Sequence, residues 1–224
     1  MNKWYMRWTY FIGVALICLS VVAFFFAYTA DEIEGWVIDS NTGQPIEGVI
    51  VLAHWQLRGG FTNKPLQELK VFEDVTDSKG RYFFPAWGPK FAFLGSLDSR
   101  SPAVYMFKPG FEVLVINNTS ADGWGYTRFS YNKKSIKMQR FTGTLAEYAS
   151  KLSWLSDDLE HIGLLYDSLC GWQSFPTMVR ALDKQETELR QAGVIYSLLA
   201  TRMKSMESRF TSANCSVEHF LAKQ

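Results

Sequence analysis

EGWVIDSNTGQPIEGVIVLAHW, residues 34–55, and EDVTDSKGRYFFP, residues 73–85, are the stretches that decide the fold of this chain. Residues 33–39 form an alternating run that ends in a group of turn-forming residues, Asp39 to Gly43, and the β-branched run 49–55 follows. A second turn at 77–80 leads into aromatic residues. Short strands separated by turns at this spacing predict a β-sandwich or a barrel.

The same pattern continues to about residue 140. Further strands are expected at residues 66–76, 82–84, 103–108, 111–116, 126–131 and 135–138. Residues 58–65 are expected to form a loop and 85–95 to be irregular, because both contain glycine and proline. The chain from 31 to 141 is therefore predicted to be one β domain.

The order of these motifs resembles the carboxypeptidase regulatory-like domain family. The residues that carry the resemblance are 35–39, 42–49, 76–77, 80–84 and 108–111. The resemblance implies a transthyretin-like antiparallel β-sandwich. It implies no activity, because in zinc carboxypeptidases this domain accompanies a catalytic domain that has no room here. The transthyretin-like hydroxyisourate hydrolases end in Tyr-Arg-Gly-Ser, which this chain lacks.

An uncharged run from Tyr10 to Tyr28 follows Lys3 and Arg7. As a helix it would rise about 28 Å, close to the hydrocarbon thickness of a bilayer. Cations before the run and none just after it predict a single-pass inner-membrane anchor within 1–30, with everything beyond it in the periplasm. A cleaved secretory signal, which would leave a secreted protein, is the alternative.

Residues 142–224 are expected to form a helical hairpin or a small bundle, which makes the whole chain α+β. A seam of apolar residues recurs at spacings of three and four: Leu145, Tyr148, Leu152, Leu155, Leu159, Ile162, Tyr166 and Leu169. Thr144 and Glu147 predict a capping box, and Pro176 begins a second helix with its own stripe. The helices either pack on each other and on the sandwich, or present a docking face for another envelope protein.

Cysteine chemistry is restricted to one candidate pair. Cys18 lies in the apolar run, so Cys170 and Cys215 are the only plausible disulfide. An unbroken second helix would separate them by about 50 Å, so a bridge requires the chain to turn back, and Gly193 is the natural place. Whether they are bridged stays open.

No set of residues in the sequence predicts catalysis, a metal or a cofactor. His54, His161 and His219 have neither the spacing nor the partners of a zinc site, and no nucleophile elbow or phosphate loop is present. The net charge of +1 gives no reason to expect nucleic acid as a partner. If the protein were an enzyme, the fold would have to bring His54, or another titratable group, into a pocket beside a catalytic partner that is distant in sequence.

Aromatic residues are the remaining candidates for binding. Trp55, Trp87, Trp124 and Tyr126 would either stack on a sugar or a partner protein, or fill the core of the sandwich and its contact with the helices. Trp124 is expected at a loop tip. The sequence therefore predicts a non-enzymatic, membrane-anchored periplasmic protein with a β-sandwich interaction module, and alternatively a carbohydrate-binding module of the cell envelope.

Overall fold

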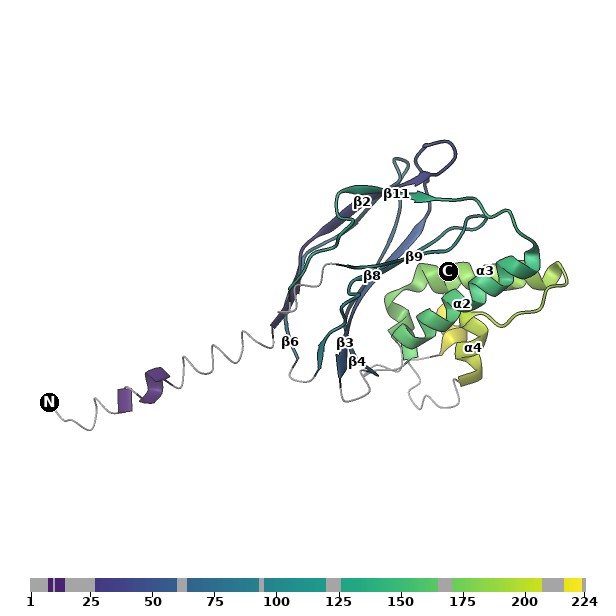
Figure 1. The fold of residues 1–224 in the computed structure, drawn as a ribbon. Coiled ribbons are helices and arrows are strands. Elements are labelled where there is room, and N and C mark those ends of the chain that lie inside the picture. The colour runs from purple at the N-terminus through teal and green to yellow at the C-terminus, as the bar shows by residue number, and fades with distance from the viewer. Residues whose placement is uncertain are drawn as a thin grey trace.

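The chain folds into three layers, two of strands and one of helices. The computed structural model describes residues 8–9, 11–14, 27–59, 64–92, 95–119, 126–164, 171–206 and 216–222. In Figure 1 the strands form two facing layers, and the helices cover the outer face of one of them. The expected α+β class is confirmed, and most strand pairs are antiparallel.

Eleven strands are named in the described part of the chain. They are β1 (Ala27–Ala30), β2 (Ile33–Asp39), β3 (Ile50–Gly59), β4 (Lys64–Val75), β5 (Arg81–Phe84), β6 (Trp87–Phe91), β7 (Ser96–Leu97), β8 (Ala103–Phe107), β9 (Leu114–Asn117), β10 (Tyr126–Thr127) and β11 (Lys134–Met138). One layer contains the sheets β10-β1-β6 and β11-β2-β5, and the other contains β4-β3-β8-β9 with β7 paired to β3. Only the β1–β10 and β2–β11 pairs among these are parallel.

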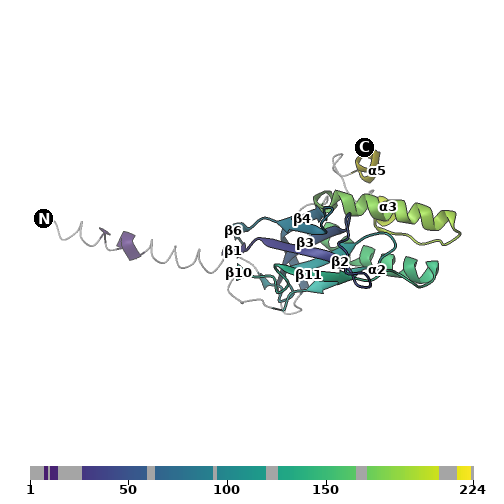
Figure 2. The ribbon, with the colours of Figure 1, turned by 90° about the horizontal axis from the view of Figure 1, so that it is seen from above.

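The helical layer lies on the β4-β3-β8-β9 sheet. It consists of α2 (Leu145–Leu164), a 3₁₀ turn η1 (Gly171–Ser174), α3 (Pro176–Gln191), α4 (Leu199–Met206) and α5 (Val217–Ala222). Figure 2, which looks from above, shows α2 and α3 side by side over the strands. This arrangement confirms a small helical bundle packed back onto the sheet.

β3 is buried on both faces and separates two apolar cores. Because side chains alternate along a strand, Val51, Ala53 and Trp55 face the core between the two sheet layers. Ile50 and Leu52 face the opposite way, into the core shared with the helices. A central strand covered on both sides accounts for the nearly continuous apolar run that begins at residue 49.

The two expected turns are confirmed, and each has an aspartate at its start. The Asp39 carboxylate accepts hydrogen bonds from the backbone of Asn41 at 2.9 Å, and that of Asp77 does the same for Lys79 at 2.9 Å. Gly80 has a φ of +71°, and a Cβ there would lie 2.4 Å from the Val37 carbonyl oxygen. Both observations require glycine at this position.

Several predicted boundaries were wrong. Residues 87–91, within the stretch expected to be irregular, form β6 and pair with β1. The expected strand at 126–131 is reduced to β10, and β3 and β4 extend into the expected loop at 58–65. The β1–β6 pairing joins segments about sixty residues apart, so no local pattern indicated it.

The N-terminal apolar run ends differently from the expectation. Ala27 and Tyr28 belong to β1, and Tyr28 is buried in the sandwich core rather than placed at a membrane interface. Most of the predicted anchor, from Tyr10 onward, lies outside the described residues. Within the described ranges, no helix has the length and apolar character needed to cross a membrane.

The capping box of α2 is confirmed. Glu147 accepts a hydrogen bond from the Thr144 backbone at 2.7 Å, and its own backbone N–H donates to the Thr144 hydroxyl at 3.3 Å. The seam residues from Tyr148 to Ile162 are buried, whereas Leu145 is 53% exposed. Seam residues Tyr166 and Leu169 lie outside the described residues.

The second apolar stripe is divided between two helices. α3 ends at Gln191, and Gly193 adopts a φ of +80°, which turns the chain toward α4. The expected turn at Gly193 is therefore present. Cys170 and Cys215 both lie outside the described residues, so the predicted disulfide stays a prediction.

Two glutamates attach the helices to their surroundings. Glu73 on β4 accepts hydrogen bonds from the backbone N–H groups of Thr177 at 2.9 Å and Met178 at 2.7 Å, at the start of α3. Glu186 is buried on α3 and accepts from the Leu198 backbone at 2.9 Å, just before α4. Each carboxylate satisfies N–H groups that a helix leaves unpaired at its N-terminus.

Candidate functional site

The helix-facing side of β3 changes character along the strand. Ile50 and Leu52 pack against the helices, but the next residues on the same face are His54, Gln56 and Arg58. The opposite face stays apolar throughout. A polar stretch on one face of a fully covered strand is costly unless its groups have partners, so this stretch marks a candidate site.

His54 and Gln56 share one carboxylate. Glu68 Oε2 lies 3.2 Å from His54 Nδ1, and Glu68 Oε1 accepts a hydrogen bond from Gln56 Nε2 at 2.7 Å. A β-bulge places Glu68 on this face: Trp55 pairs with Lys70 but Gln56 pairs with Glu68, so the register skips Leu69. Bulges of this kind re-aim side chains next to functional sites.

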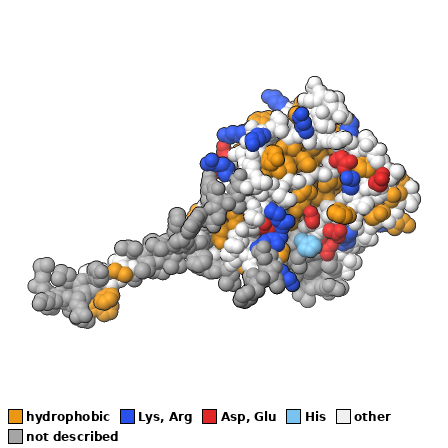
Figure 3. All heavy atoms as spheres, viewed as in Figure 1, with side chains coloured by type: hydrophobic (Ala, Val, Ile, Leu, Met, Phe, Trp, Pro, Cys, Tyr) orange, Lys and Arg blue, Asp and Glu red, His pale blue; other side chains and the backbone are white. Residues whose placement is uncertain are grey.

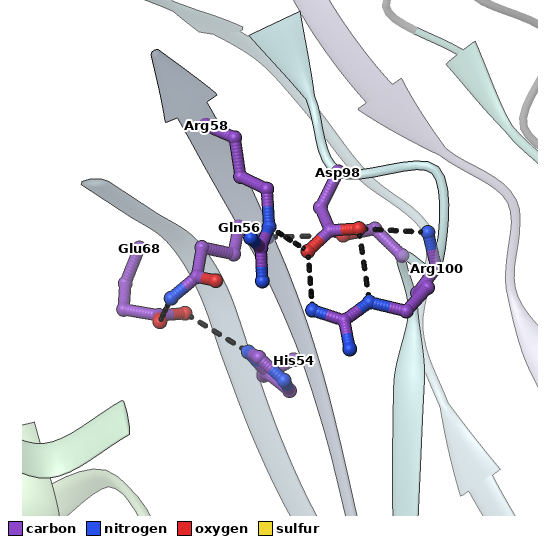
Figure 4. A network of polar contacts seen from close by, with 7 residues as sticks. His54, Gln56, Arg58, Glu68, Asp98 and Arg100 are labelled. Carbon is purple, nitrogen blue, oxygen red and sulfur yellow. Dashed lines mark hydrogen bonds and ion pairs between the residues drawn. The ribbon is translucent and has the colours of Figure 1, made fainter. Parts of the chain in front are cut away.

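Asp98 is held between two arginines. It follows β7 and accepts hydrogen bonds from Arg58 Nε and from Arg100 Nη2, the latter at 3.1 Å. Figure 4 shows His54, Gln56 and Arg58 along β3, with Glu68 on one side and Asp98 and Arg100 on the other. Burial alone would raise the pKa of Asp98, but the hydrogen bonds from Arg100 and Arg58 outweigh it and lower the pKa to about 2.

Above these residues lies a cavity of about 250 Å³ between the sheet and α2. His54 and Tyr105 form part of its floor, with exposed fractions of 8% and 7%, and Asp158 and His161 reach it from α2. Loss of water around Asp158 raises the pKa of its carboxyl group, while His161, His54 and Arg100 act in the opposite direction. Burial also raises the pKa of the Tyr105 hydroxyl, so this group is a donor at neutral pH.

Some polar atoms in the cavity wall have no hydrogen-bond partner among the described residues. Within the described part of the chain, neither the Tyr105 hydroxyl nor the Asp158 carboxylate has a hydrogen-bond partner. If Nδ1 of His54 donates its proton to Glu68, Nε2 of the same ring is left as an acceptor. The cavity therefore offers both donors and acceptors to a ligand.

A shallower groove of about 480 Å³ continues from the cavity along α2. The two share Val115 and Asp158 in their walls. Trp154 lines the groove and is 75% exposed. Figure 3 shows one face of the molecule, on which charged side chains of both signs and a histidine gather beside a band of apolar side chains.

Of the aromatic residues singled out from the sequence, Trp55 lies in the sandwich core and Trp87 packs against that core. Trp55 is 1% exposed in the sandwich core, where its Nε1 donates to the Thr127 hydroxyl at 2.9 Å. Trp87 contacts it edge-on, with ring centroids 5.5 Å apart. Trp55 therefore has no exposed face for a ligand. Trp124 and the side chain of Tyr126 lie outside the described residues.

The arrangement suits binding, and it places a histidine beside a carboxylate. The His54–Glu68 pair is the contact that acid–base chemistry would require. A hydroxyl in the cavity wall, Ser101 Oγ, is buried and already accepts a hydrogen bond from the Gln56 backbone at 3.1 Å. Among the described residues, no three His, Cys, Asp or Glu side chains cluster so as to hold a metal ion.

Sequence reasoning singled out His54 but missed its neighbours Glu68 and Tyr105, and it missed Asp98, Asp158 and Trp154. One local signal was available. In residues 49–58 every odd position is apolar, whereas the even positions change from Ile50 and Leu52 to His54, Gln56 and Arg58. The other signal is that Trp154 falls between the seam positions of the helix, which places it on the outer face.

Comparisons with known proteins give no family. No protein-family model matches the sequence, and no curated protein is significantly similar to it. Among solved structures, the C-terminal domain of the shaft pilin SpaA from Lactobacillus rhamnosus GG is similar at 10% identity, covering 51% of this chain and 98% of that domain, with a TM-score of 0.24. A 9R-lipoxygenase from Cyanothece PCC8801 is similar at 13% identity and a TM-score of 0.29, covering 70% of this chain. This chain spans 26% of the lipoxygenase, and at such TM-scores neither likeness supports an inference.

Proposed function

We propose that this protein is a non-enzymatic binding protein that acts outside the cytoplasm and holds a small polar ligand in the cavity between β3, β8 and α2. The apolar run from Tyr10 up to β1, which begins at Ala27, tethers it to the inner membrane, with the folded part in the periplasm, or is removed as a secretory signal. The observation that carries the proposal is the cavity itself, because its wall combines the buried side chains of His54 and Gln56 with the Tyr105 hydroxyl and the Asp158 carboxylate, neither of which has a hydrogen bond to a described residue.

The energetics of burial support a ligand. Tyr105 is 7% exposed, and its hydroxyl, in the cavity wall, has no hydrogen bond to a described residue, so a ligand that displaces water from it must supply a partner. A chain selected only for stability would place an apolar residue there, as it does at neighbouring Val104 and Met106 on the other face of β8. A bound ligand, or water that the ligand displaces, gives the Tyr105 hydroxyl a partner.

The fold belongs to the proposal as well. We regard the β domain as a member of the carboxypeptidase regulatory-like family with a transthyretin-like sandwich. The turns at Gly43 and Gly80, both with positive φ, support this assignment, as does the β3 strand that follows the first of them. In that family the domain accompanies other units, which agrees with an interaction module beneath a helical layer.

A ligand screen by thermal unfolding tests the proposal. Sugars, amino acids and small organic acids are added to the purified chain, and the midpoint of unfolding is measured. A ligand at a hundred times its Kd stabilises a protein by about 2.7 kcal/mol, which is readily detected. The stabilisation should disappear in Asp158→Asn and persist in Asp157→Asn, the matched control one residue away. Equal stabilisation of both variants would remove the cavity as the site.

The compartment is tested separately. Protease added to spheroplasts should digest the folded part, and protease added to intact cells should not. Protection in spheroplasts would contradict a periplasmic location.

A second candidate function, acid–base catalysis on the bound ligand, is favoured by the His54–Glu68 pair at 3.2 Å. One experimental result distinguishes catalysis from binding alone. The ligand found in the screen would be converted to a product by the wild-type chain and not by His54→Gln. Recovery of the ligand unchanged after prolonged incubation supports binding alone.

A further inference from the structure

The cavity and the groove together have the composition of a site for an uncharged, hydroxyl-rich ligand. Their volumes of about 250 and 480 Å³ are continuous through Val115 and Asp158, and small-molecule sites span roughly 300–1,000 Å³. One end is polar and enclosed by buried side chains, and the other carries an exposed indole. An elongated ligand with hydrogen-bonding groups and a flat apolar face fits both ends.

Apart from Asp158, the charged side chains discussed here are paired or hydrogen-bonded within the protein. Asp98 is paired with Arg58 and Arg100, and Glu68 contacts His54. In the groove, Lys151 pairs with Glu112 at 2.9 Å and Glu147 is used by the capping box of α2. A charged ligand would have to break one of these pairs or lie beside a like charge, which costs free energy.

Asp158 is the one carboxylate of the cavity wall without a hydrogen-bond partner among the described residues. Arg100 lines the same cavity and supplies a positive charge there. A ligand hydroxyl can donate to Asp158 and accept from the Tyr105 hydroxyl at the same time. Hydroxyl groups supply both roles without adding charge.

Trp154 supplies the remaining contact. An aromatic side chain that is 75% exposed, next to Val113 and Val115 in the groove wall, is a large apolar surface left in water. The C–H face of a pyranose ring is flat and apolar, and it packs on such a ring while its hydroxyl groups point sideways. We infer that the ligand is a neutral oligosaccharide, with one sugar ring on Trp154 and the hydroxyl groups of the next sugar at Asp158 and Tyr105.

This inference rests on the proposed binding function and adds Trp154, a tryptophan that the sequence did not single out. The test is titration calorimetry on the full chain, in a detergent without a sugar headgroup. The probes are the neutral maltohexaose, cellohexaose and chitohexaose, an anionic hexagalacturonate and a cationic glucosamine hexamer. At least one neutral probe should bind, about tenfold more tightly than either charged probe.

Variants locate the binding. Trp154→Ala and Asp158→Asn should each weaken the neutral probe about tenfold or more, and Trp154→Phe should weaken it less. Leu145→Ala, an exposed apolar residue on the same helix but outside both hollows, should leave affinity within twofold. Because Trp154 and Leu145 are exposed, both alanine variants are expected to fold, and circular dichroism checks this.

The outcomes separate the two proposals. Tighter binding of a charged hexamer, or full affinity in Trp154→Ala, overturns the neutral-oligosaccharide inference and leaves the binding function standing. The same holds if no hexamer binds but a non-sugar ligand from the thermal screen depends on Asp158. Failure of every hexamer and of every compound in the screen overturns both.

Discussion

Replacing Glu73 with alanine should loosen the contact between the sheet and the helical layer. α3 begins at Pro176, which has no N–H group, so Thr177 and Met178 carry the first free donors of the helix. Both donate to Glu73, 104 and 105 residues away in sequence. The next backbone N–H, that of Val179, bonds to the Phe175 carbonyl at 3.3 Å. Glu73 therefore caps α3 from a neighbouring strand.

The size of the effect follows from these two contacts. A helix N-cap contributes about 1 kcal/mol, and a hydrogen bond to a charged group about 1.5–3 kcal/mol. Glu73→Ala removes both bonds and the charge near the positive end of the helix, and should lower the free energy of unfolding by about 2–3 kcal/mol. Glu73→Gln keeps one acceptor oxygen and should cost about 1 kcal/mol.

Urea unfolding, followed by tryptophan fluorescence, measures this difference. Glu112→Ala is the matched control, because Glu112 also joins the strand region to a helix, through an ion pair with Lys151 that is partly exposed. Such pairs contribute about 0–1 kcal/mol. Hydrogen exchange of the Thr177 and Met178 amides should accelerate in Glu73→Ala. If Glu73→Ala cost no more than the control, the capping role would be refuted.

Three further predictions concern stability. The pKa of Asp98 lies at about 2 rather than 3.8, so its ion pairs stabilise the fold above pH 4, and this stabilisation is lost as the pH falls toward 2. Because Arg100 is about half exposed, solvent screens the pair and the stabilisation is about 1 kcal/mol. The unfolding free energy of Asp98→Asn should lack this loss on acid titration. Glu186→Ala should cost about 2 kcal/mol in urea unfolding, since it leaves buried donors unpaired, whereas Lys184→Ala, at an exposed position of the same helix, should stay within about 0.5 kcal/mol. Trp55→Ala should cost about 3–5 kcal/mol and Trp154→Ala under about 0.5 kcal/mol, and equal thermal shifts in the two would contradict their assigned positions.

The parts of the fold that follow from local chemistry could be predicted from the sequence. β2 was expected at 33–39, where the structure has it, because alternation and the Asp39–Gly43 turn are contained in one short window. The α2 capping box needs only Thr144 and Glu147, three residues apart. The turn at Gly193 was expected from a single glycine in a helical pattern.

Features that depend on long-range pairing could not be predicted. β6 looks irregular because Gly88 and Pro89 lie within it, and its partner β1 was assigned to the apolar leader. The bulge at Leu69 has no sequence signature, yet it places Glu68 beside His54. Gln185 and Glu186 are polar residues buried within α3, and only in the fold do they find partners, at Tyr148 and at the start of α4.

The candidate site lies between these two cases. The change from Leu52 to His54 and Gln56 on one face of β3 is visible in the sequence, and it indicates where apolar packing against that face ends. The partners across the cavity come from β4, the loop after β7 and α2, so only the fold brings them together. Trp154 lies on the exposed side of α2, where no periodic pattern of apolar residues indicates a role for a single tryptophan.

The central claim is that a ligand occupies the cavity between β3 and α2, with Trp154 at its edge. A ¹H–¹⁵N spectrum of the folded chain, titrated with the tightest-binding neutral oligosaccharide, tests it most directly. The account predicts that the Trp154 indole signal and the backbone amides of His54 and Asp158 shift together with a single Kd, while the indole of buried Trp55 does not move. Shifts confined to residues away from this cavity, or no shift with any probe, would contradict it.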